Sequence, residues 1–255
     1  SAVNNTDVNT RVGWYSQSRS DADTAWSGNP MKFPRIQGAD CCGQITSVGS
    51  AIDPARIGER VLVRTMQEPL SVDGDLIPIT LGSEIDGAFA EYLSVRGSEA
   101  FVIDSPLDDA DLASFPCSYS TAEGLLQRAQ VGAERVLITG ASGGVGSAAV
   151  QLAAMRGASV VAGTTGAHAD DVKRIGAADT IDRASDLVDQ LGDSSIDVVI
   201  DLVGGPHFES LLRVLRPGGR YAIAGAVAGA HVALDLRDLY LKDLTFYGCT
   251  FHPRS

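Results

Sequence analysis

A glycine-rich turn between a buried strand and an amphipathic helix is the feature that most constrains the fold of this chain. Residues Arg135–Thr139 form a short apolar run typical of a buried strand, and the turn Gly140–Gly146 follows it directly. Gly157 then provides a helix stop. Between these points the apolar residues recur at helical spacing, at Val145, Ala149, Leu152 and Ala153. The order strand, turn, helix opens a βαβ unit, which builds a parallel sheet.

The same alternation of strand-like and helix-like segments continues through the second half of the chain. Helices are predicted at Asp170–Ile175 and from Pro206, which suits a first helical position, and Pro217–Gly219 ends the latter helix. The predicted strands after the first are Ala158–Ala162, Asp179–Ile181, Ile196–Val203, Arg220–Ala224 and Leu244–Cys249. Six strands joined by helices predict an α/β fold with a doubly wound parallel sheet, the Rossmann arrangement.

The first half of the chain has a different pattern, rich in short strands and loops. Strand-like pieces occur at Ile45–Val48, Val61–Arg64 and Ala88–Val95, separated by Gly, Pro, Asp and Ser. The stretches Ser16–Pro30 and Glu68–Leu81 show no period and are interpreted as loops. A chain of 255 residues is long enough for two domains. We predict a β-rich domain over residues 1–122 and a Rossmann domain over residues 123–255, bridged by a helix near residues 120–130.

The residue types in the glycine turn suit the binding of a dinucleotide diphosphate. Gly143 allows close approach of the backbone to the diphosphate, and Gly146 allows the helix to pack against the strand. Open N–H groups at the start of the helix attract the anion. Ala141 stands where the first glycine of such motifs is usual. The predicted contacts are Ala141, Ser142, Gly143, Gly144, Val145 and Gly146; the alternative is a tight turn that binds nothing.

The segment after the second predicted strand favours NADP(H) over NAD(H). An NAD site usually places an acid about 20 residues past the glycines, where it accepts from the ribose hydroxyls. Here the sequence is Gly163-Thr164-Thr165-Gly166, and the first acid, Asp170, lies within the next predicted helix. A 2′-phosphate would therefore meet no carboxylate. Candidate partners for it are Thr164, Thr165, His168, Lys173 and Arg183.

Charge and composition exclude several classes of partner. The formal net charge of −12 repels nucleic acid and anionic membrane surfaces, and no apolar run approaches the roughly 20 residues of a membrane span. The four cysteines show no CxxC spacing, and no charged-then-apolar leader opens the sequence. The expected partner is a small molecule, and the expected compartment is the cytoplasm.

Several separated segments carry a family pattern as a set. Besides the glycine turn they are Val3–Gly13, Pro34–Gly43, Gly58–Val61, Gly87–Tyr92, Ser120–Ala122, Asp197–Gly205 and Gly218–Arg220. With these segments the chain resembles the medium-chain dehydrogenase/reductase superfamily, in its zinc-independent quinone oxidoreductase-like or enoyl reductase-like branch. The resemblance implies a GroES-like catalytic domain, a Rossmann domain, a cleft between them, and a homodimer formed through Leu244–Cys249. Relative to the family pattern, strands are expected before Val3 and further elements after the sixth strand. The residues that the resemblance places near the nicotinamide end are Thr121, Val203, Gly225, Ala226, Thr250 and Phe251.

The positions that hold catalytic zinc in alcohol dehydrogenases of this superfamily do not carry a zinc site here. Asn4 and Ala39 stand where a Cys and a His would be, and of the three ligands only Cys117 is present. The first histidine, His168, falls in the other domain, and no Cys for a structural zinc lobe occurs in Arg64–Leu81. No metal is therefore expected. The adjacent Cys41 and Cys42 are interpreted as small buried residues of a strand.

Without a metal to stabilise an alkoxide, reduction of a simple ketone is disfavoured, whereas a conjugated acceptor gives an enolate that hydrogen-bond donors can hold. The prediction is NADPH-dependent reduction of a quinone or of an α,β-unsaturated carbonyl. Asn4, Thr6 and Tyr15 are the candidate catalytic residues, with Tyr15 as a possible proton donor. Two alternatives stay open: a zinc-type alcohol dehydrogenase, and an NADPH-binding protein without turnover.

Overall fold

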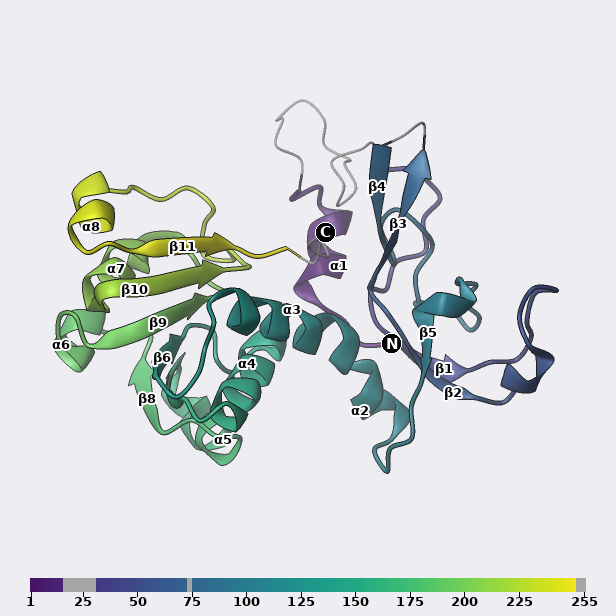
Figure 1. Cartoon of the computed structure of the whole chain (residues 1–255), viewed down its shortest axis with the longest axis horizontal. Helices are drawn as coiled ribbons and strands as arrows, with labels where there is room; N and C mark the ends of the chain where they lie inside the picture. The colour runs from purple at the N-terminus through teal and green to yellow at the C-terminus, as the bar shows by residue number, and fades with distance from the viewer. Residues whose placement is uncertain (16–30, 73–74, 251–255) are drawn as a thin grey trace. The chain divides into compact units, whose positions relative to one another are not determined.

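The computed structural model describes residues 1–15, 31–72 and 75–250, which form two compact units. One unit lies within Ser1–Ser118 and the other begins at Tyr119, so the boundary falls inside helix α3 (Phe115–Arg128). None of the helices in the described part of the chain combines the length and apolar character that a bilayer crossing requires. Figure 1 labels the elements of both units.

The second unit contains a parallel sheet of six strands, as the sequence predicts. The strands lie in the order β11-β10-β9-β6-β7-β8 (Figure 1), and every neighbouring pair is parallel. Their bounds are β6 (Arg135–Ile138), β7 (Ser159–Thr164), β8 (Asp179–Asp182), β9 (Ile196–Asp201), β10 (Leu215–Ile223) and β11 (Thr245–Gly248). The α/β fold class and the Rossmann arrangement are thus confirmed.

Helices cover both faces of this sheet because its strands are apolar on both sides. Along β6, Val136 and Ile138 pack into one core with α3, α4 (Gly144–Met155) and α5 (Ala169–Arg174), whereas Leu137 packs into the other. That second core receives residues of α6 (Leu187–Leu191), α7 (Phe208–Val214) and α8 (Leu236–Leu241). Short 3-10 turns precede two of the helices, at η3 (Gly166–His168) and η4 (Gly205–His207).

The strand order creates a topological switch point between β6 and β9. The chain runs from β6 outward through β7 to β8, and then returns to β9 on the other side of β6. The turns that leave the carboxyl ends of β6 and β9 therefore diverge, and in sheets of this type ligands bind at that edge. The glycine turn follows β6 at this edge.

The first unit contains two small antiparallel sheets. β1 (Cys41–Gln44), β2 (Arg60–Val63) and β5 (Ala100–Val102) form one, and β3 (Met66–Val72) pairs with β4 (Asp75–Thr80). The helical elements are α1 (Asn5–Arg11), η1 (Pro54–Arg56), η2 (Gly97–Glu99) and α2 (Asp109–Ala113). A small core of Val63, Leu81 and Ala88 lies beneath the first sheet.

Two strand predictions for this unit are wrong. The strand expected at Ile45–Val48 lies earlier, at Cys41–Gln44, opposite β2; beyond it, Ile45 still exchanges backbone hydrogen bonds with Gly58 and Glu59, where the chain turns. Cys41 and Cys42 do lie in a strand, but both are half-buried rather than buried. Residues 88–95 form no strand; their first residues instead bond the 36–38 segment, with the Phe89 N–H donating to the Gln37 carbonyl at 2.8 Å.

The stretch expected to be irregular, Glu68–Leu81, contains most of a hairpin. Its strands pair from Met66 opposite Thr80 to Val72 opposite Asp75. Pro69 falls where the register shifts between Gln67 and Leu70, and a two-stranded ribbon tolerates proline because each strand has a free edge. The segment was predicted as a loop because the proline and the polar residues interrupt the alternating pattern that is typical of a strand. The predicted loop Ser16–Pro30 lies outside the described residues.

In the second unit the differences are confined to element ends. Strand β10 begins at Leu215 rather than Arg220, and its pairing with β9 shifts register across the Pro217–Gly219 segment. Pro206 lies in η4, one turn ahead of α7. The other predicted strands and helices of this unit match within a few residues.

Candidate functional site

The glycine turn has a backbone geometry that side chains would obstruct. Gly143 is the N-cap of α4 in an extended conformation (φ −81°, ψ 173°), and its N–H donates to the Gly140 carbonyl at 3.0 Å. A Cβ on Gly146 would lie 2.1 Å from that same carbonyl oxygen. Because no Cβ fits at that distance, Gly146 must remain glycine for α4 to start so close to the end of β6.

The start of α4 presents an open set of hydrogen-bond donors. The N–H groups of Gly144, Val145 and Gly146 precede Ser147, whose N–H makes the first helical hydrogen bond, to the Gly143 carbonyl at 2.8 Å, and no side chain caps this helix end. Ser142, Gly143 and Gly144 are exposed, whereas Ala141 is fully buried beneath them. Exposed amides at the start of a 12-residue helix suit an anionic group such as a diphosphate.

A buried hydroxyl without a partner lies at the end of the neighbouring strand. Thr164 ends β7, is 3% exposed, and its Oγ1 makes no hydrogen bond. An unsatisfied buried hydroxyl is unfavourable and is a feature that a bound ligand can satisfy. The turn, the open amides and this hydroxyl together fit a dinucleotide whose adenosine half extends from the glycine turn past β7.

The residues proposed for the cofactor's 2′-position are only partly brought together. The Arg183 N–H donates to the Thr164 carbonyl at 3.1 Å, which places the exposed Arg183 beside Thr164 and the half-buried Thr165. His168 is exposed, and its Nδ1 lies 3.5 Å from the Asp171 carboxylate, within its own helical segment. Of the candidates, Arg183 is therefore the cation closest to the end of β7 by backbone contact, and Lys173 is a solvent-exposed residue of α5.

Three of the residues proposed for the nicotinamide end do lie together. Val203 follows β9 and Gly225–Ala226 follow β10; a Cβ on Gly225 would lie 2.6 Å from the Leu202 carbonyl oxygen, and one on Gly204 would lie 3.2 Å from Ala226 Cα. The other three lie apart from them along the chain. Thr121 is a half-buried residue of α3, Thr250 is exposed and accepts from Arg128 at 3.2 Å, and Phe251 lies outside the described residues.

A buried carboxylate that the sequence analysis missed organises this region. Asp201, the last residue of β9, is 0% exposed and accepts from the Thr139 hydroxyl at 2.6 Å and from the Tyr221 hydroxyl. Burial, and then the neighbouring Asp201 carboxylate, raise the pKa of Tyr221 well above its ordinary value, so the phenol stays protonated. The available signal was an acid that ends an otherwise apolar buried strand.

In the first unit, Thr6 and Tyr15 form a hydrogen-bonded pair. The Tyr15 hydroxyl donates to Thr6 Oγ1 at 3.1 Å and accepts from Asn9 Nδ2 at 3.5 Å. Burial raises the pKa of Tyr15 above its ordinary value, and its hydrogen bonds with Thr6 and Asn9 only partly oppose this shift. The phenol is therefore a protonated donor at neutral pH.

Asn4 belongs to a second cluster, around the buried Asp40. Asn4 Nδ2 donates to one Asp40 oxygen at 2.7 Å, and the Cys117 N–H, in the first turn of α3, donates to the other at 2.7 Å. Burial raises the pKa of Asp40, while these two hydrogen bonds lower it. Burial also raises the pKa of the Cys117 thiol far above its ordinary value. The sequence analysis quoted Asp40 only as a neighbour of Ala39 and did not foresee this role.

The side chains of Asn4 and Asp40 form a hydrogen-bonded cluster with the backbone of Cys117. Both Asp40 oxygens accept a hydrogen bond, and Cys117 is 4% exposed. Over residues 1–15, 31–72 and 75–250, no group of three or more His, Cys, Asp or Glu side chains is arranged to hold a metal ion. At the position of the first zinc-ligating Cys of the related alcohol dehydrogenases, Asn4 has a carboxamide that donates to Asp40.

Comparison with known families and proteins agrees with this architecture. Residues 2–106 match the alcohol dehydrogenase GroES-like domain, and residues 144–254 match the zinc-binding dehydrogenase family. Acryloyl-coenzyme A reductase of Metallosphaera sedula is 31% identical over 233 residues, covering 86% of this chain and 68% of the relative. A solved structure described as a putative alcohol dehydrogenase from Sinorhizobium meliloti 1021 has a TM-score of 0.88 at 43% identity, covering 97% of this chain and 71% of that one.

A third relative is the putative quinone oxidoreductase YhfP of Bacillus subtilis. It is 29% identical over 235 residues, covering 87% of this chain and 66% of the relative. Its solved structure, with NAD bound, has a TM-score of 0.70 at 26% identity and covers 98% of this chain and 70% of that one. A GroES-like unit followed by a Rossmann sheet defines a two-domain oxidoreductase. The chain belongs to the medium-chain dehydrogenase/reductase superfamily, in its quinone- and enoyl-reductase-like branch.

Proposed function

We propose that this protein is an NADPH-dependent reductase of carbon–carbon double bonds conjugated to a carbonyl, or of quinones, that works without catalytic zinc. The observation that carries the proposal is the set of residues at the family's zinc-ligand positions: Asn4 supplies a carboxamide whose Nδ2 donates to Asp40, Ala39 has no ligating side chain, and only Cys117 is a ligand type. Residues 1–122 would supply the substrate side and residues 123–255 the cofactor side. The name of the M. sedula relative, an acryloyl-coenzyme A reductase, supports a conjugated thioester as one substrate class.

The glycine turn and the end of β7 would hold a reduced nicotinamide cofactor, which would supply the hydride for the β-carbon of the acceptor. Negative charge would then develop on the carbonyl oxygen. Asn4 is the proposed donor for that oxygen: one of its amide hydrogens is given to Asp40, which orients the group, and the other would be available to the substrate. Tyr15 supplies the proton to the α-carbon, and Thr6, its hydrogen-bond partner, relays a replacement proton. A neutral donor set of this kind stabilises an enolate but not a fully developed alkoxide, which favours conjugated acceptors over simple ketones.

NADP(H) is the proposed cofactor because Thr164 and Thr165 give the end of β7 hydroxyls, with the exposed Arg183 nearby, and the acid Asp182 belongs to the neighbouring strand β8, where it pairs with Thr164. Arg183 lies beside Thr164 and Thr165 and is available to a 2′-phosphate. The acid nearest this edge, Asp182, accepts from the Ala184 N–H at 3.0 Å within its own turn. The YhfP structure contains NAD, so the choice between the cofactors must be measured for this protein.

The decisive experiment is an acceptor screen with both reduced cofactors. The purified chain is titrated with NADPH and NADH by fluorescence, and oxidation is then followed with an enoyl thioester, a 2-alkenal, a quinone and a simple ketone, before and after chelator treatment. Preference for NADPH, turnover of conjugated acceptors only, and insensitivity to chelator support the proposal. Stoichiometric zinc with ketone reduction would show a zinc-type alcohol dehydrogenase, and binding without any turnover would show a cofactor-binding protein.

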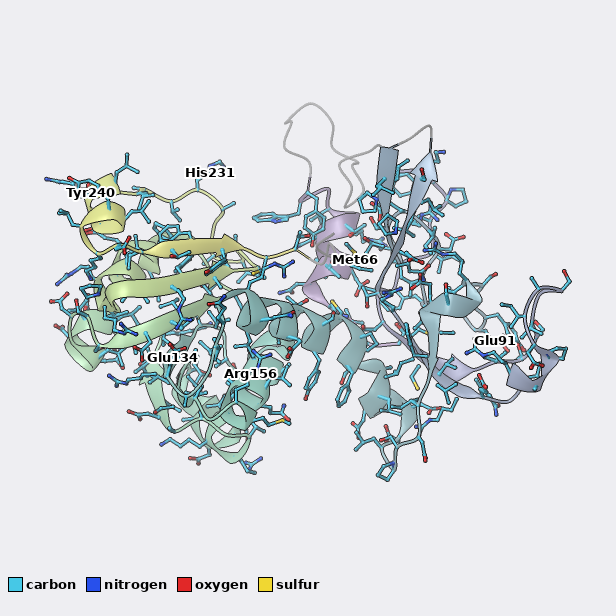
Figure 2. The ribbon with its side chains drawn as sticks, viewed as in Figure 1. Met66, Glu91, Glu134, Arg156, His231 and Tyr240 are labelled. Carbon is cyan, nitrogen blue, oxygen red and sulfur yellow. The ribbon has the colours of Figure 1, made fainter. Side chains whose placement is uncertain are left out.

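The proposal includes a homodimer formed through strand β11. This strand lies at one edge of the sheet, so its outer backbone groups can pair with a second copy. The neighbouring α8 exposes Leu236, Leu241 and Tyr240, the last of which is marked in Figure 2. Light scattering of the purified chain tests this, since a monomer at all concentrations would exclude it.

The proposed compartment is the reducing cytoplasm, which suits four cysteines that are not held in disulfides.

A further inference from the structure

The buried carboxylate of Asp201 accepts hydrogen bonds from two side chains and from the backbone of the turn that follows β9. Besides the hydroxyls of Thr139 and Tyr221, it accepts from the N–H of Val203 at 2.9 Å and from the N–H of Gly204 at 3.1 Å. These four donors occupy both oxygens of the carboxylate. A fully buried charge needs such compensation, and the arrangement shows that the surrounding segments are built around this one side chain.

The network lies at the switch point of the sheet. Thr139 follows β6, Asp201 ends β9 and Tyr221 belongs to β10, so the carboxylate links three adjacent strands near their carboxyl ends. The Leu202 N–H also donates to Thr139 Oγ1, at 3.0 Å. The amide groups of three consecutive residues after β9 are therefore all held by this network.

The turn that Asp201 holds is packed tightly against two other loops. A Cβ on Gly140 would lie 3.2 Å from Val203 Cγ2, which places the glycine turn in contact with Val203. The Val203 carbonyl accepts from the Ala228 N–H at 2.9 Å, and a Cβ on Gly205 would lie 2.7 Å from the Ala228 carbonyl oxygen. Movement of the Val203–Gly204 turn would therefore displace both the glycine turn and the loop after β10.

We infer that Asp201 is a positioning residue for hydride transfer: it fixes the Val203–Gly204 turn so that this turn, with Gly225 and Ala226, forms the wall that holds the nicotinamide end of the cofactor. The inference rests on the proposed function. Asp201 is completely buried, so it touches neither cofactor nor substrate and acts only through the backbone that it holds. The adenosine half of the cofactor, at the glycine turn and β7, depends on other contacts.

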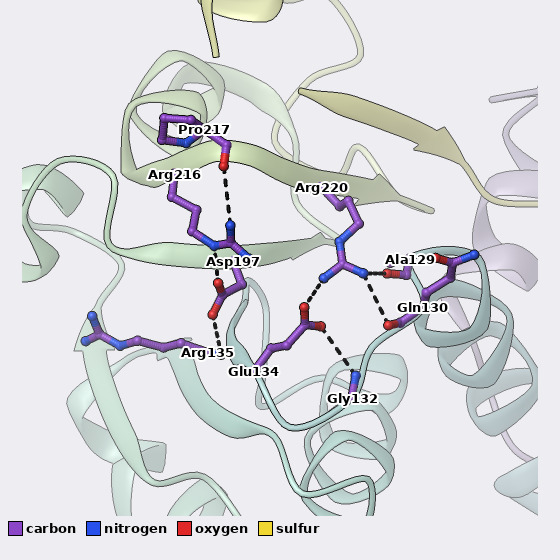
Figure 3. Close-up of polar contacts among 9 residues, drawn as sticks. All are labelled: Ala129, Gln130, Gly132, Glu134, Arg135, Asp197, Arg216, Pro217 and Arg220. Atoms are coloured by element: carbon purple, nitrogen blue, oxygen red, sulfur yellow. Dashed lines mark hydrogen bonds and ion pairs between the residues drawn. The ribbon is translucent and has the colours of Figure 1, made fainter. Parts of the chain in front are cut away.

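Asp197, four residues earlier on β9, provides a matched control. Its carboxylate accepts from the Arg135 N–H at 2.7 Å and pairs with Arg216, at the opposite end of the strand (Figure 3). Asp197→Asn therefore removes a comparable charged acceptor from the same strand, far along the sheet from the Val203–Gly204 turn. Tyr221→Phe is the second test variant, because it removes one donor to Asp201 and keeps the ring that packs edge-on against Phe208 with centroids 5.5 Å apart.

The experiment compares Asp201→Asn, Tyr221→Phe and Asp197→Asn in the full chain. ADP, the half that NADPH and NADH share, is used to measure adenosine-side affinity; the fluorescence of bound NADPH reports the surroundings of the ring; and single-turnover oxidation of bound NADPH reports hydride transfer. We expect Asp201→Asn to slow hydride transfer roughly 10- to 100-fold and to change the bound fluorescence, with ADP affinity kept within about twofold. Tyr221→Phe should show a smaller change of the same kind, and Asp197→Asn should lower only thermal stability.

Two results would overturn the inference. One is normal ring fluorescence and normal hydride transfer in Asp201→Asn; the other is equal weakening of ADP and NADPH, which would make Asp201 a support of the whole unit. If Asp201→Asn does not fold, Tyr221→Phe decides by the same criteria. Failure of the unaltered chain to bind ADP or NADPH would instead overturn the proposed function, and this inference with it.

Discussion

Substitution of Gly143 by Ala separates cofactor binding from folding, because the free protein has room for the added methyl group. A Cβ at this position would meet its nearest neighbour, the Gly140 carbonyl oxygen, at 3.4 Å, which is an ordinary contact, and the φ of −81° suits alanine. The change in unfolding free energy should stay within about 1 kcal/mol. Alanine lowers the conformational entropy of the unfolded chain, which stabilises the fold, whereas it is a poorer N-cap residue than glycine. The stability of Gly143→Ala should therefore stay close to that of the unaltered chain.

Binding should respond strongly to the same methyl group. If the diphosphate lies on the open amides of α4, the methyl group holds it away from at least one of them. A hydrogen bond to a charged group is worth about 1.5–3 kcal/mol, so the dissociation constants of NADPH and ADP should both rise roughly 10- to 100-fold. The assay is fluorescence titration for NADPH and calorimetry for ADP, with chemical denaturation of the same samples.

Two further glycine variants calibrate this result. Gly132→Ala, where nothing lies within 4 Å of the new Cβ, should change neither property. Gly146→Ala places its Cβ 2.1 Å from the Gly140 carbonyl oxygen, so α4 must retreat and stability should fall by about 1–3 kcal/mol. Wild-type affinity for both nucleotides in Gly143→Ala would refute the placement of the diphosphate on this turn.

Three other outcomes are expected. Arg183→Glu should reverse the preference for NADPH over NADH by roughly tenfold or more in kcat/KM, because it places a carboxylate beside the end of β7; an unchanged ratio would contradict the assignment. Since the pKa of Tyr15 is raised above 10.0, the donor stays protonated through neutral pH, and a rate limited by its proton should not fall on the alkaline side below about pH 10, whereas Tyr15→Phe should slow turnover at every pH. Arg220→Ala should destabilise the second unit by about 2–3 kcal/mol in denaturant unfolding, because Arg220 donates to the Ala129 carbonyl at 2.7 Å and pairs with Glu134 (Figure 3); loss of less than the exposed control Arg237→Ala would contradict this.

Local sequence patterns predicted most of the strands and helices of the second unit. Continuous apolar runs such as Ile196–Val203 predict strands covered on both faces, and the glycine turn after Arg135–Thr139 predicts the start of a helix beside a parallel strand. In these segments the requirement for burial and the backbone freedom of glycine act over a few neighbouring residues. The sequence therefore determined the α/β class, the strand sequence and the position of the turn.

The first unit followed its pattern less closely, because its strands depend on partners distant in the chain. Strand β1 ends where β2 begins opposite it, and the hairpin from Met66 to Thr80 is held by its own pairing despite two prolines and many polar residues. No local period encodes where a partner strand stops. Register and strand length were therefore decided by the tertiary structure.

The burial of two carboxylates could likewise not be predicted from the sequence. Asp40 and Asp201 are both 0% exposed, yet an acid next to an apolar run is usually a solvated residue at a strand end. Their roles follow from donors brought to them by folding: Asn4 and Cys117 for Asp40, and Thr139 with the Val203–Gly204 turn for Asp201. Sequence alone determined which segments of the second unit form strands and where the glycine turn stands. Only the tertiary structure decided which acids are buried, because burial of a charge depends on partners that lie 36, 62 or 77 residues away.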